Sequence, residues 1–274
     1  MKTSARVTVS TVATFVLGLA AASPVHAVPV IANGGFEAGL TSWTKADQLG
    51  SEGSFFSQSG TVSPINGDPV PAPPEGTKAA MTDAAGPGSH VLYQDFVATA
   101  DAAALRFALF IGNRADRFAT PLSLDFSTPT LNQQARVDIL KSTADPFSVA
   151  VADVLANLYQ TKVGDPLVNG YNTITTDISA LLAAHVGETL RLRFAETDNL
   201  LEFQLGVDNV RIDPISAPIP EPPSTLLFGT ALALLVGCRV ITRSGRGLAG
   251  ARRTEAGMEG LPSILNRIQG GRTR

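Results

Sequence analysis

Apolar and polar residues alternate along several short segments of this chain. In residues 105–109 and 190–194 the apolar side chains occupy one parity and arginines lie on the other. A period of two puts successive side chains on opposite faces of a β-strand, so one face of each strand is expected to be buried and the other solvated, as in antiparallel sheets. Eight strands are predicted, at residues 78–82, 90–97, 105–111, 122–126, 135–141, 171–177, 189–195 and 203–212.

Two segments have a helical spacing instead. Residues 149–159 carry apolar side chains at intervals of three and four, and residues 178–186 form a second short helical candidate. The region before residue 76 is rich in glycine, proline and serine, and residues 69–74 predict an exposed polyproline-type connection. Short strands separated by turn residues predict an all-β fold, namely an antiparallel β-sandwich of the jelly-roll type with short helical inserts.

The first 27 residues have the three parts of a secretory signal peptide. Lys2 and Arg6 form a basic start, residues 7–22 are uncharged and mostly apolar, and residues 25–27 form a small-residue cleavage site. We expect export through the inner membrane and cleavage after Ala27. An uncleaved N-terminal anchor or a core helix is the alternative.

A second apolar segment, residues 225–238, lies near the other end of the chain. Its 14 residues would form a helix of about 21 Å, which is shorter than the hydrocarbon core of a bilayer at about 30 Å. Arg239 and Arg243 follow it as the stop of a positive-inside segment, and extension through Ile241 brings the helix closer to the bilayer thickness. The segment predicts a transmembrane helix, although its length alone also fits a buried helix.

The tripeptide Pro220-Glu221-Pro222 stands immediately before this segment. Together with the short apolar helix and the arginines Arg239 and Arg243, it resembles the PEP-CTERM sorting signal of exopolysaccharide-producing Gram-negative bacteria. The resemblance implies recognition in the inner membrane by an exosortase that cuts near the tripeptide. Members of that family usually end soon after the basic residues, whereas this chain continues through residues 244–274, so cleavage is left open.

These signals divide the chain into a signal peptide (1–27), an exported domain (28–217), a sorting signal with its transmembrane helix (218–243) and a basic tail (244–274) that we expect to be disordered. The exported domain, at about 190 residues, is long enough for one hydrophobic core.

The exported region is strongly acidic. Residues 28–219 contain 21 acidic and 11 basic side chains, a net charge of −10. This balance argues against nucleic acid or anionic lipid as a partner, because both require clustered cations, and it is compatible with bound Ca²⁺ or with neutral glycans. The single cysteine, Cys238, lies in the apolar segment, so no disulfide is available to the exported domain.

Two stretches at opposite ends of this domain carry a second resemblance. Residues 33–37, followed by Gly39, Leu40 and Trp43, resemble the opening of galactose-binding-like and carbohydrate-binding-module jelly rolls, and residues 206–212 resemble their closing strand. The resemblance implies that these stretches lie side by side and that a structural Ca²⁺ bridges them.

In that case Glu37 and Asp208 would supply carboxylates, and backbone carbonyls near Gly35 would complete the oxygen shell. The alternative is that Glu37 and Asp208 are ordinary turn carboxylates.

No catalytic residues are predicted. After the signal peptide only His90 and His185 remain as histidine bases, and the chain has neither a G-x-S-x-G nor an H-E-x-x-H motif. The match of residues 245–250 to G-x-G-x-x-G is attributed to chance, because no strand is predicted before it. Carboxyl groups leave a glycoside hydrolase open as an alternative; the candidates are Glu196, Asp198, Glu202, Asp95, Asp116 and Asp138.

The aromatic residues do not single out a ligand site. Trp43 is expected to be buried, and Tyr93, Tyr159 and Tyr171 are the other amphipathic candidates. The sequence therefore predicts a cell-surface or extracellular-matrix protein with a binding or structural role linked to exopolysaccharide, whose glycan-binding residues stay unassigned. The alternatives are a secreted polysaccharide-active hydrolase and a scaffold or adhesin without a specific glycan ligand.

Overall fold

The computed structural model describes residues 31–101 and 103–215. The predicted signal peptide, the sorting tripeptide with Arg239 and Arg243, the transmembrane helix and the basic tail lie outside the described residues. Within the described ranges, no helix is long and apolar enough to cross a membrane.

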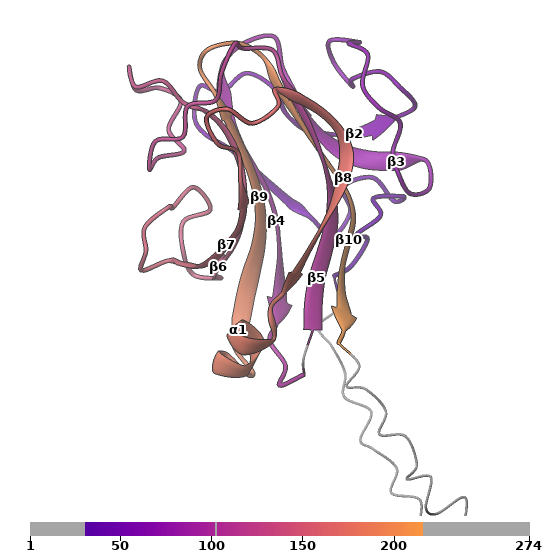
Figure 1. Ribbon diagram of the computed structural model, residues 1–274, viewed down its shortest axis with the longest axis vertical. Coiled ribbons are helices and arrows are strands. Elements are labelled where there is room, and N and C mark those ends of the chain that lie inside the picture. Colours follow the sequence, from indigo (N-terminus) through magenta and orange to yellow (C-terminus); the bar gives the residue numbers. More distant parts are fainter. Residues whose placement is uncertain (1–30, 102, 216–274) are drawn as a thin grey trace, which may run out of the picture. The chain divides into compact units, whose positions relative to one another are not determined.

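The described chain is an antiparallel β-sandwich, as predicted. Figure 1 shows two layers of strands face to face, with the one short helix of the described part at one end. The elements, in chain order, are β1 (Thr44–Asp47), β2 (Ser54–Ser59), β3 (Lys78–Asp83), β4 (Gly88–Val97), β5 (Ala103–Asn113), β6 (Gln133–Lys141), β7 (Val154–Gln160), β8 (Val168–Asp177), α1 (Ser179–Ala184), β9 (Thr189–Asp198) and β10 (Phe203–Pro214).

The strands form two five-stranded sheets. The first sheet has the order β1-β4-β9-β6-β7 and the second has the order β2-β3-β10-β5-β8. All paired neighbours are antiparallel. Strands β7 and β8 are therefore edge strands, one of each sheet, while β10 is the central strand of the second sheet.

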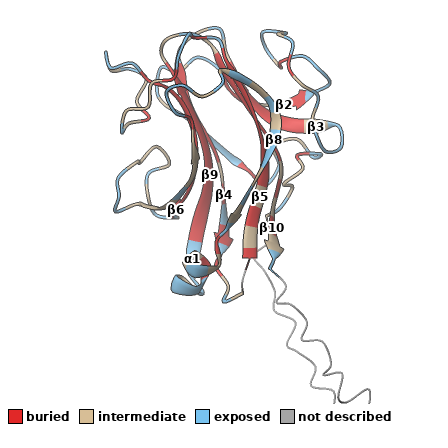
Figure 2. Cartoon of the chain, viewed as in Figure 1, coloured by how far each residue is buried: buried red, intermediate tan, exposed pale blue. Residues whose placement is uncertain are grey.

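The core fills the space between the inner faces of the two sheets, as the buried residues of Figure 2 show. Leu92, Phe194 and Val137 form one row across β4, β9 and β6, and all three are fully buried. Phe107 of the opposite sheet meets Phe194 edge to face, with ring centroids 5.5 Å apart. The alternation read from the sequence therefore correctly identifies the buried face of these strands.

Two of the sequence-based assignments are wrong. Residues 122–126 form a loop, in which the Asp125 carboxylate accepts a hydrogen bond from the Ser127 N–H at 2.9 Å. Residues 149–159 are not helical: a turn leads into strand β7. The pairing of β7 with β6 shifts register between Val137 and Asp138 and again between Ile139 and Leu140. Each shift inserts one extra residue, which converts the expected period of two into intervals of three and four.

A buried ion cluster fastens the loop between β6 and β7 to the outer face of the first sheet. Asp138 accepts hydrogen bonds from Arg136 and Arg193, and the Arg193 guanidinium also donates to the carbonyls of Pro146 and Ser148, both at 2.7 Å. Burial alone would raise the pKa of Asp138, but the Arg136 hydrogen bond and both guanidinium charges outweigh it and hold that pKa below its ordinary value.

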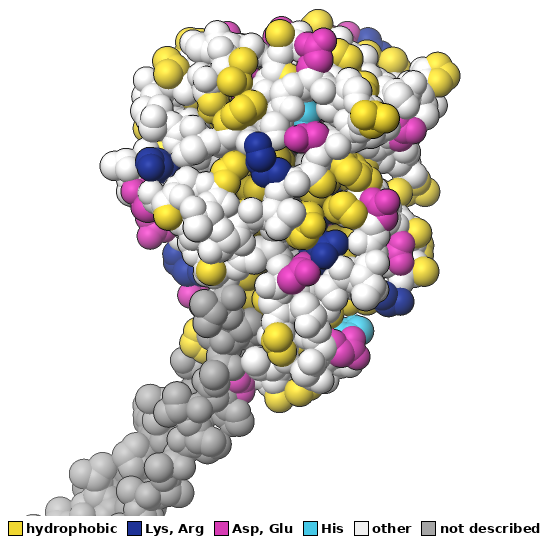
Figure 3. Space-filling view, turned by 180° about the vertical axis from the view of Figure 1, so that it is seen from behind, with side chains coloured by type: hydrophobic (Ala, Val, Ile, Leu, Met, Phe, Trp, Pro, Cys, Tyr) yellow, Lys and Arg dark blue, Asp and Glu magenta, His cyan; other side chains and the backbone are white. Residues whose placement is uncertain are grey.

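Basic side chains are dispersed on the surface. On the face drawn in Figure 3, lysine and arginine side chains stand singly among acidic and apolar ones and do not gather into a patch.

Candidate functional site

The opening segment of the domain packs against β10. The Gly34 carbonyl accepts a hydrogen bond from the Val210 N–H at 2.9 Å. Gly34 approaches so closely that an added Cβ would lie 1.8 Å from the Val210 carbonyl oxygen. The two ends of the described domain therefore lie side by side, as the resemblance to jelly rolls implied.

The two carboxylates expected to bind calcium both hold the segment that precedes β3. Glu37 accepts hydrogen bonds from the N–H groups of Thr77 and Lys78 and from the Thr77 hydroxyl, all at 2.8 Å. Asp208 is fully buried, and it accepts from the Glu75 N–H at 3.1 Å and from the Asn209 N–H at 2.7 Å.

Charge accumulates around Asp208. Burial, together with the charges of Glu75 and Glu37, raises the pKa of Asp208 to about 6, even though two N–H groups oppose the shift. The hydrogen bonds from Thr77 and Lys78 lower the pKa of Glu37. Among residues 31–101 and 103–215 no group of three or more His, Cys, Asp or Glu side chains is spaced to hold a metal, so a cation here would need backbone oxygens, as expected near Gly35.

Three of the candidate catalytic acids form ion pairs with arginines. Asp95 pairs with Arg191 at 2.7 Å, Asp116 pairs with Arg117 at 2.7 Å, and Asp138 belongs to the buried ion cluster. These pairs occupy the carboxylates with structural partners.

The two histidines also lack the geometry of a nucleophile's base. His90 is 2% exposed, and its Nδ1 lies 2.7 Å from an Asp47 oxygen, while the Ser54 hydroxyl donates to the other Asp47 oxygen at 2.9 Å. The carboxylate thus stands between the hydroxyl and the imidazole, whereas a catalytic triad requires the imidazole to contact the hydroxyl. His185 pairs with Glu188 at 2.9 Å on the surface.

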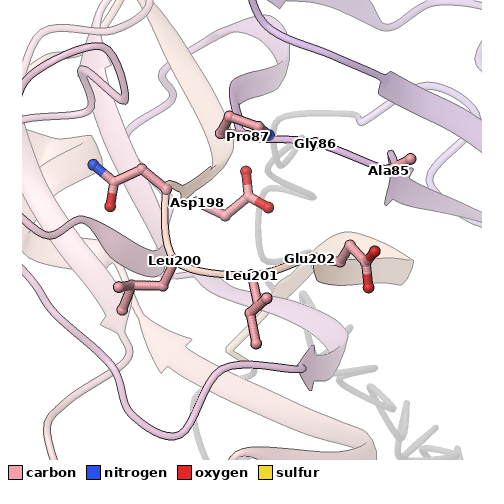
Figure 4. Close-up of a pocket in the computed structure, with 8 residues that line it drawn as sticks. Ala85, Gly86, Pro87, Asp198, Leu200, Leu201 and Glu202 are labelled. Carbon is pink, nitrogen blue, oxygen red and sulfur yellow. The ribbon is translucent and has the colours of Figure 1, made fainter.

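The remaining candidate acids meet at one end of the sandwich. A pocket of about 150 Å³ lies between residues 85–87 and the turn that joins β9 to β10. Figure 4 shows the Asp198 carboxyl group directed towards Ala85, Gly86 and Pro87, with Glu202 further along the turn. Glu196 lies deeper, on the same inner face of β9, and is 1% exposed.

The protein environment raises the pKa of both buried acids. Burial and the charge of Glu202 raise the pKa of Asp198 to about 7, against the opposing hydrogen bond from the Gly88 N–H at 2.7 Å. Burial and the charge of Asp198 raise the pKa of Glu196 well above its ordinary value. These two carboxyls are therefore protonated over part of the neutral and acidic range.

Trp43 is buried, as predicted. It is 8% exposed and packs between Phe36 and Phe194, with ring centroids at 5.2 and 5.9 Å, and its indole N–H donates to the Asn33 carbonyl at 3.1 Å. Its role is to close the core behind the opening segment.

Two of the three tyrosines are engaged with neighbouring side chains. Tyr93 lies under the Arg191 guanidinium, 4.1 Å from the ring centroid. Tyr171 packs on Phe110 and donates its hydroxyl proton to Gln58 at 2.7 Å, and burial raises its pKa.

Tyr159 is the tyrosine that borders open space. It is half-buried near the end of edge strand β7, and it lines two surface cavities of about 490 and 270 Å³. Both cavities also include Asp165, so we treat them as one groove, the Tyr159 groove. It extends from β7 of the first sheet to β8 of the second. Its polar side chains include Asn157, Gln160, Lys162, Asn169 and Asn172.

The tyrosine hydroxyl stays neutral in this groove. Burial, followed by the charge of Asp165, raises the pKa of Tyr159. The hydroxyl can therefore both donate and accept hydrogen bonds throughout the physiological range. The sequence does not reveal the groove, because the spacing of residues 149–159 predicts a helix in place of an edge strand. The amides that recur at Asn169 and Asn172 were the signal available in the sequence.

Comparison with known proteins assigns no family to this chain. No family model matches the chain, and no curated protein matches it. Among solved structures, the carbohydrate-binding module TmCBM61 in complex with β-1,4-galactotriose is similar with a TM-score of 0.41 and 10% identity, over 68% of this chain and 97% of that one.

Two further structures are similar at the same level. The K3 cleaved adhesin domain of Lys-gingipain from Porphyromonas gingivalis W83 has a TM-score of 0.41 and 12% identity, over 67% of this chain and 98% of that one. A Stig cyclase from Fischerella sp. TAU has a TM-score of 0.39 and 19% identity, over 69% of this chain and 99% of that one.

Proposed function

We propose that this chain is an exported, non-catalytic protein that binds a polysaccharide of the cell surface or extracellular matrix in the Tyr159 groove. The observation that carries the proposal is the groove itself, in which one partly buried aromatic ring lies among planar amides. We also propose that the sandwich has the jelly-roll topology that the sequence predicts.

The composition of the groove suits a sugar chain. An aromatic ring offers an apolar face to the C–H face of a pyranose, and its hydroxyl remains available for hydrogen bonding. The Asn169 amide can donate and accept hydrogen bonds, which matches the mixed character of sugar hydroxyls. The amide N–H groups of Asn157 and Gln160 already donate to Asp138 and Gln134, so these two residues offer their carbonyl oxygens as acceptors. Two cavities that share Tyr159 would hold more than one sugar unit.

The same groove is poorly equipped for hydrolysis. Glycoside hydrolysis uses two carboxyl groups on opposite sides of the scissile bond. Asp165 is the one acidic residue among the described residues that line the groove. We therefore favour binding over turnover.

The route to the cell surface is proposed from the sequence. The signal peptide would direct export, the C-terminal helix would hold the chain in the membrane, and Pro220-Glu221-Pro222 with its following arginines would present it to an exosortase. The acidic charge of the exported region supports a neutral ligand rather than an anionic one.

We also propose that a structural Ca²⁺ joins the ends of the domain. Support comes from Glu37 and Asp208, whose carboxylates contact one short segment, and from the negative charge that Glu75 adds nearby. Bound there, a hard cation would be held by these two carboxylates and by backbone oxygens near Gly35 and would tie together a domain without disulfides.

The binding proposal is tested with polysaccharides, including that of the producing cell. Tyr159→Ala should weaken binding at least tenfold, which corresponds to about 1.4 kcal/mol, while Tyr159→Phe, which keeps the ring, should lose less. Tyr159→Phe should unfold at a temperature close to that of the wild type. Tyr159→Ala also removes a ring that packs against the core and should unfold at a lower temperature, so binding is compared where both variants are folded. Unchanged affinity in Tyr159→Ala would remove the groove from consideration, and sugar release over time would favour the hydrolase.

A further inference from the structure

The pocket between residues 85–87 and the β9–β10 turn is separate from the Tyr159 groove and has a different chemistry. Its described ionisable lining residues, Asp198 and Glu202, are both acidic. The rest of the lining is largely apolar, with Leu200, Leu201 and Pro87 among the contacts. A group that enters this pocket meets negative charge at one side and hydrocarbon at the other.

Two unpartnered polar atoms lie directly behind the pocket. His90 Nε2 and one carboxyl oxygen of Glu196 are buried without hydrogen-bond partners among the described residues. The two residues are paired across β4 and β9, and the next pair on the same face of the sheet, towards the pocket, is Gly88 with Asp198.

The imidazole is aimed towards the pocket. A Cβ built on Gly88 would lie 2.3 Å from His90 Nε2, so the ring reaches over the glycine in the direction of residues 85–87. The absence of a side chain at Gly88 leaves room for that orientation. The buried polar groups and the pocket acids thus form one acceptor-rich end of the sandwich.

Donors reach Asp198 but not the acceptors behind it, and the Phe203 N–H is one of those that donate to the Asp198 carboxylate. The Gly88 N–H donates to Asp198 at 2.7 Å, whereas the Glu196 oxygen and His90 Nε2 have no described partner. A primary ammonium carries three donors and no acceptor, and its attached carbon atoms match the leucine and proline contacts. A divalent cation fits less well, because the described residues contain no group of three or more acidic or histidine side chains spaced for a metal.

We propose that this pocket binds the primary ammonium group of an amino sugar, such as a hexosamine without an N-acetyl group. The inference rests on the proposed glycan-binding function and adds a second recognition element to it. A volume of about 150 Å³ admits the amino-bearing edge of one sugar ring, while the remainder of a chain would stay outside.

Binding should depend on pH because the ammonium needs a charged carboxylate. The pKa of Asp198 is raised to about 7 by burial and by Glu202, so an ammonium must displace a proton at lower pH. The neighbouring titratable groups are Glu196, His90 and Glu52, whose carboxylate borders Gly86. With one proton released per ligand, affinity should rise about 20-fold from pH 5 to pH 6.5, where a sugar amine stays protonated.

The test is titration of the full chain with D-glucosamine and with N-acetyl-D-glucosamine, monitored by ligand-observed NMR at pH 5 and pH 6.5. Wild-type protein should bind glucosamine at least tenfold more tightly than the acetylated sugar, with the stated rise in affinity. Equal affinity for the two sugars, or glucosamine affinity that does not change with pH, would overturn the proposal.

Two substitutions locate the effect. Asp198→Asn should abolish the preference and its pH dependence, while Asp116→Asn, which changes an exposed acid paired with Arg117, should preserve both. The amine preference is measured with monosaccharides and the groove proposal with polysaccharides, so the two proposals fail separately. A preference for glucosamine that survives Asp198→Asn would refute the assignment, and if that variant does not fold, the wild-type comparison still decides.

Discussion

The buried carboxyl of Asp198 should make the domain less stable as pH rises towards neutrality. Its pKa is raised to about 7 in the folded protein, whereas an unfolded aspartate titrates near 3.8. Between these values the folded state binds more protons than the unfolded state, so the contribution of Asp198 to stability is fully present below about pH 4 and is lost as pH rises through about 7.

The size of this effect follows from the two pKa values. The difference between them corresponds to a change of about 4 kcal/mol in the free energy of unfolding for one fully buried group. Asp198 is close to that limit, because it is 4% exposed. Glu196 changes stability in the same direction, because its pKa is also raised. Carboxylates with lowered pKa values, such as Asp138 and Glu37, act in the opposite direction, but in the window below about pH 4.

The assay is urea unfolding at intervals between pH 4.5 and pH 8, with and without Asp198→Asn. The asparagine oxygen can still accept the Gly88 hydrogen bond, so the variant should be closest to the wild type at the acidic end of this range. Its advantage in unfolding free energy should then grow by roughly 1–3 kcal/mol by pH 8. Asp116→Asn is the exposed control and should leave the slope unchanged. Wild-type stability that stays constant or increases over this range would refute the reasoning, as would a variant with the full wild-type slope.

Four further outcomes are expected. Gly34→Ala should destabilise the domain by about 1–3 kcal/mol because its Cβ would collide with β10, whereas Gly35→Ala, with open space around it, should have little effect on the melting temperature. Arg193→Met should cost about 3–5 kcal/mol in urea unfolding because it leaves the Asp138 charge buried with one partner fewer. Chelation by EDTA should lower the melting temperature if calcium is bound, and an unchanged melt would remove the metal. Mass spectrometry of exported protein should find Val28 at the N-terminus, and an intact Met1 would contradict cleavage.

Sequence periodicity predicted the strands that bury one face, and it failed where the backbone departs from a regular pleat. In β9 the alternation from Leu190 to Phe194 is uninterrupted, and the predicted strand is confirmed. In β7 two bulges shift the apolar residues to helical intervals. Hydropathy cannot register a bulge, because the extra residue is defined by the partner strand.

The candidate site was predictable only in part, for a related reason. Asp198 and Glu202 are close in sequence, and their shared pocket could be anticipated from that proximity. Residues 85–87 join them only through the pairing of β4 with β9. The raised pKa of Asp198 likewise depends on burial between two sheets, which local composition does not encode.

The central position of β10 has a mechanical consequence. The strand begins at Phe203, beside Asn113, at the end of the sandwich that holds the Tyr159 groove, and it finishes at Pro214 at the opposite end. A protein tethered beyond Pro214 and pulled through a ligand in the groove would be loaded along this strand. The hydrogen bonds that join β10 to β3 and to β5 would then bear the load in shear, so many of them must break together. The domain would therefore resist mechanical unfolding far better than if an edge strand were peeled away.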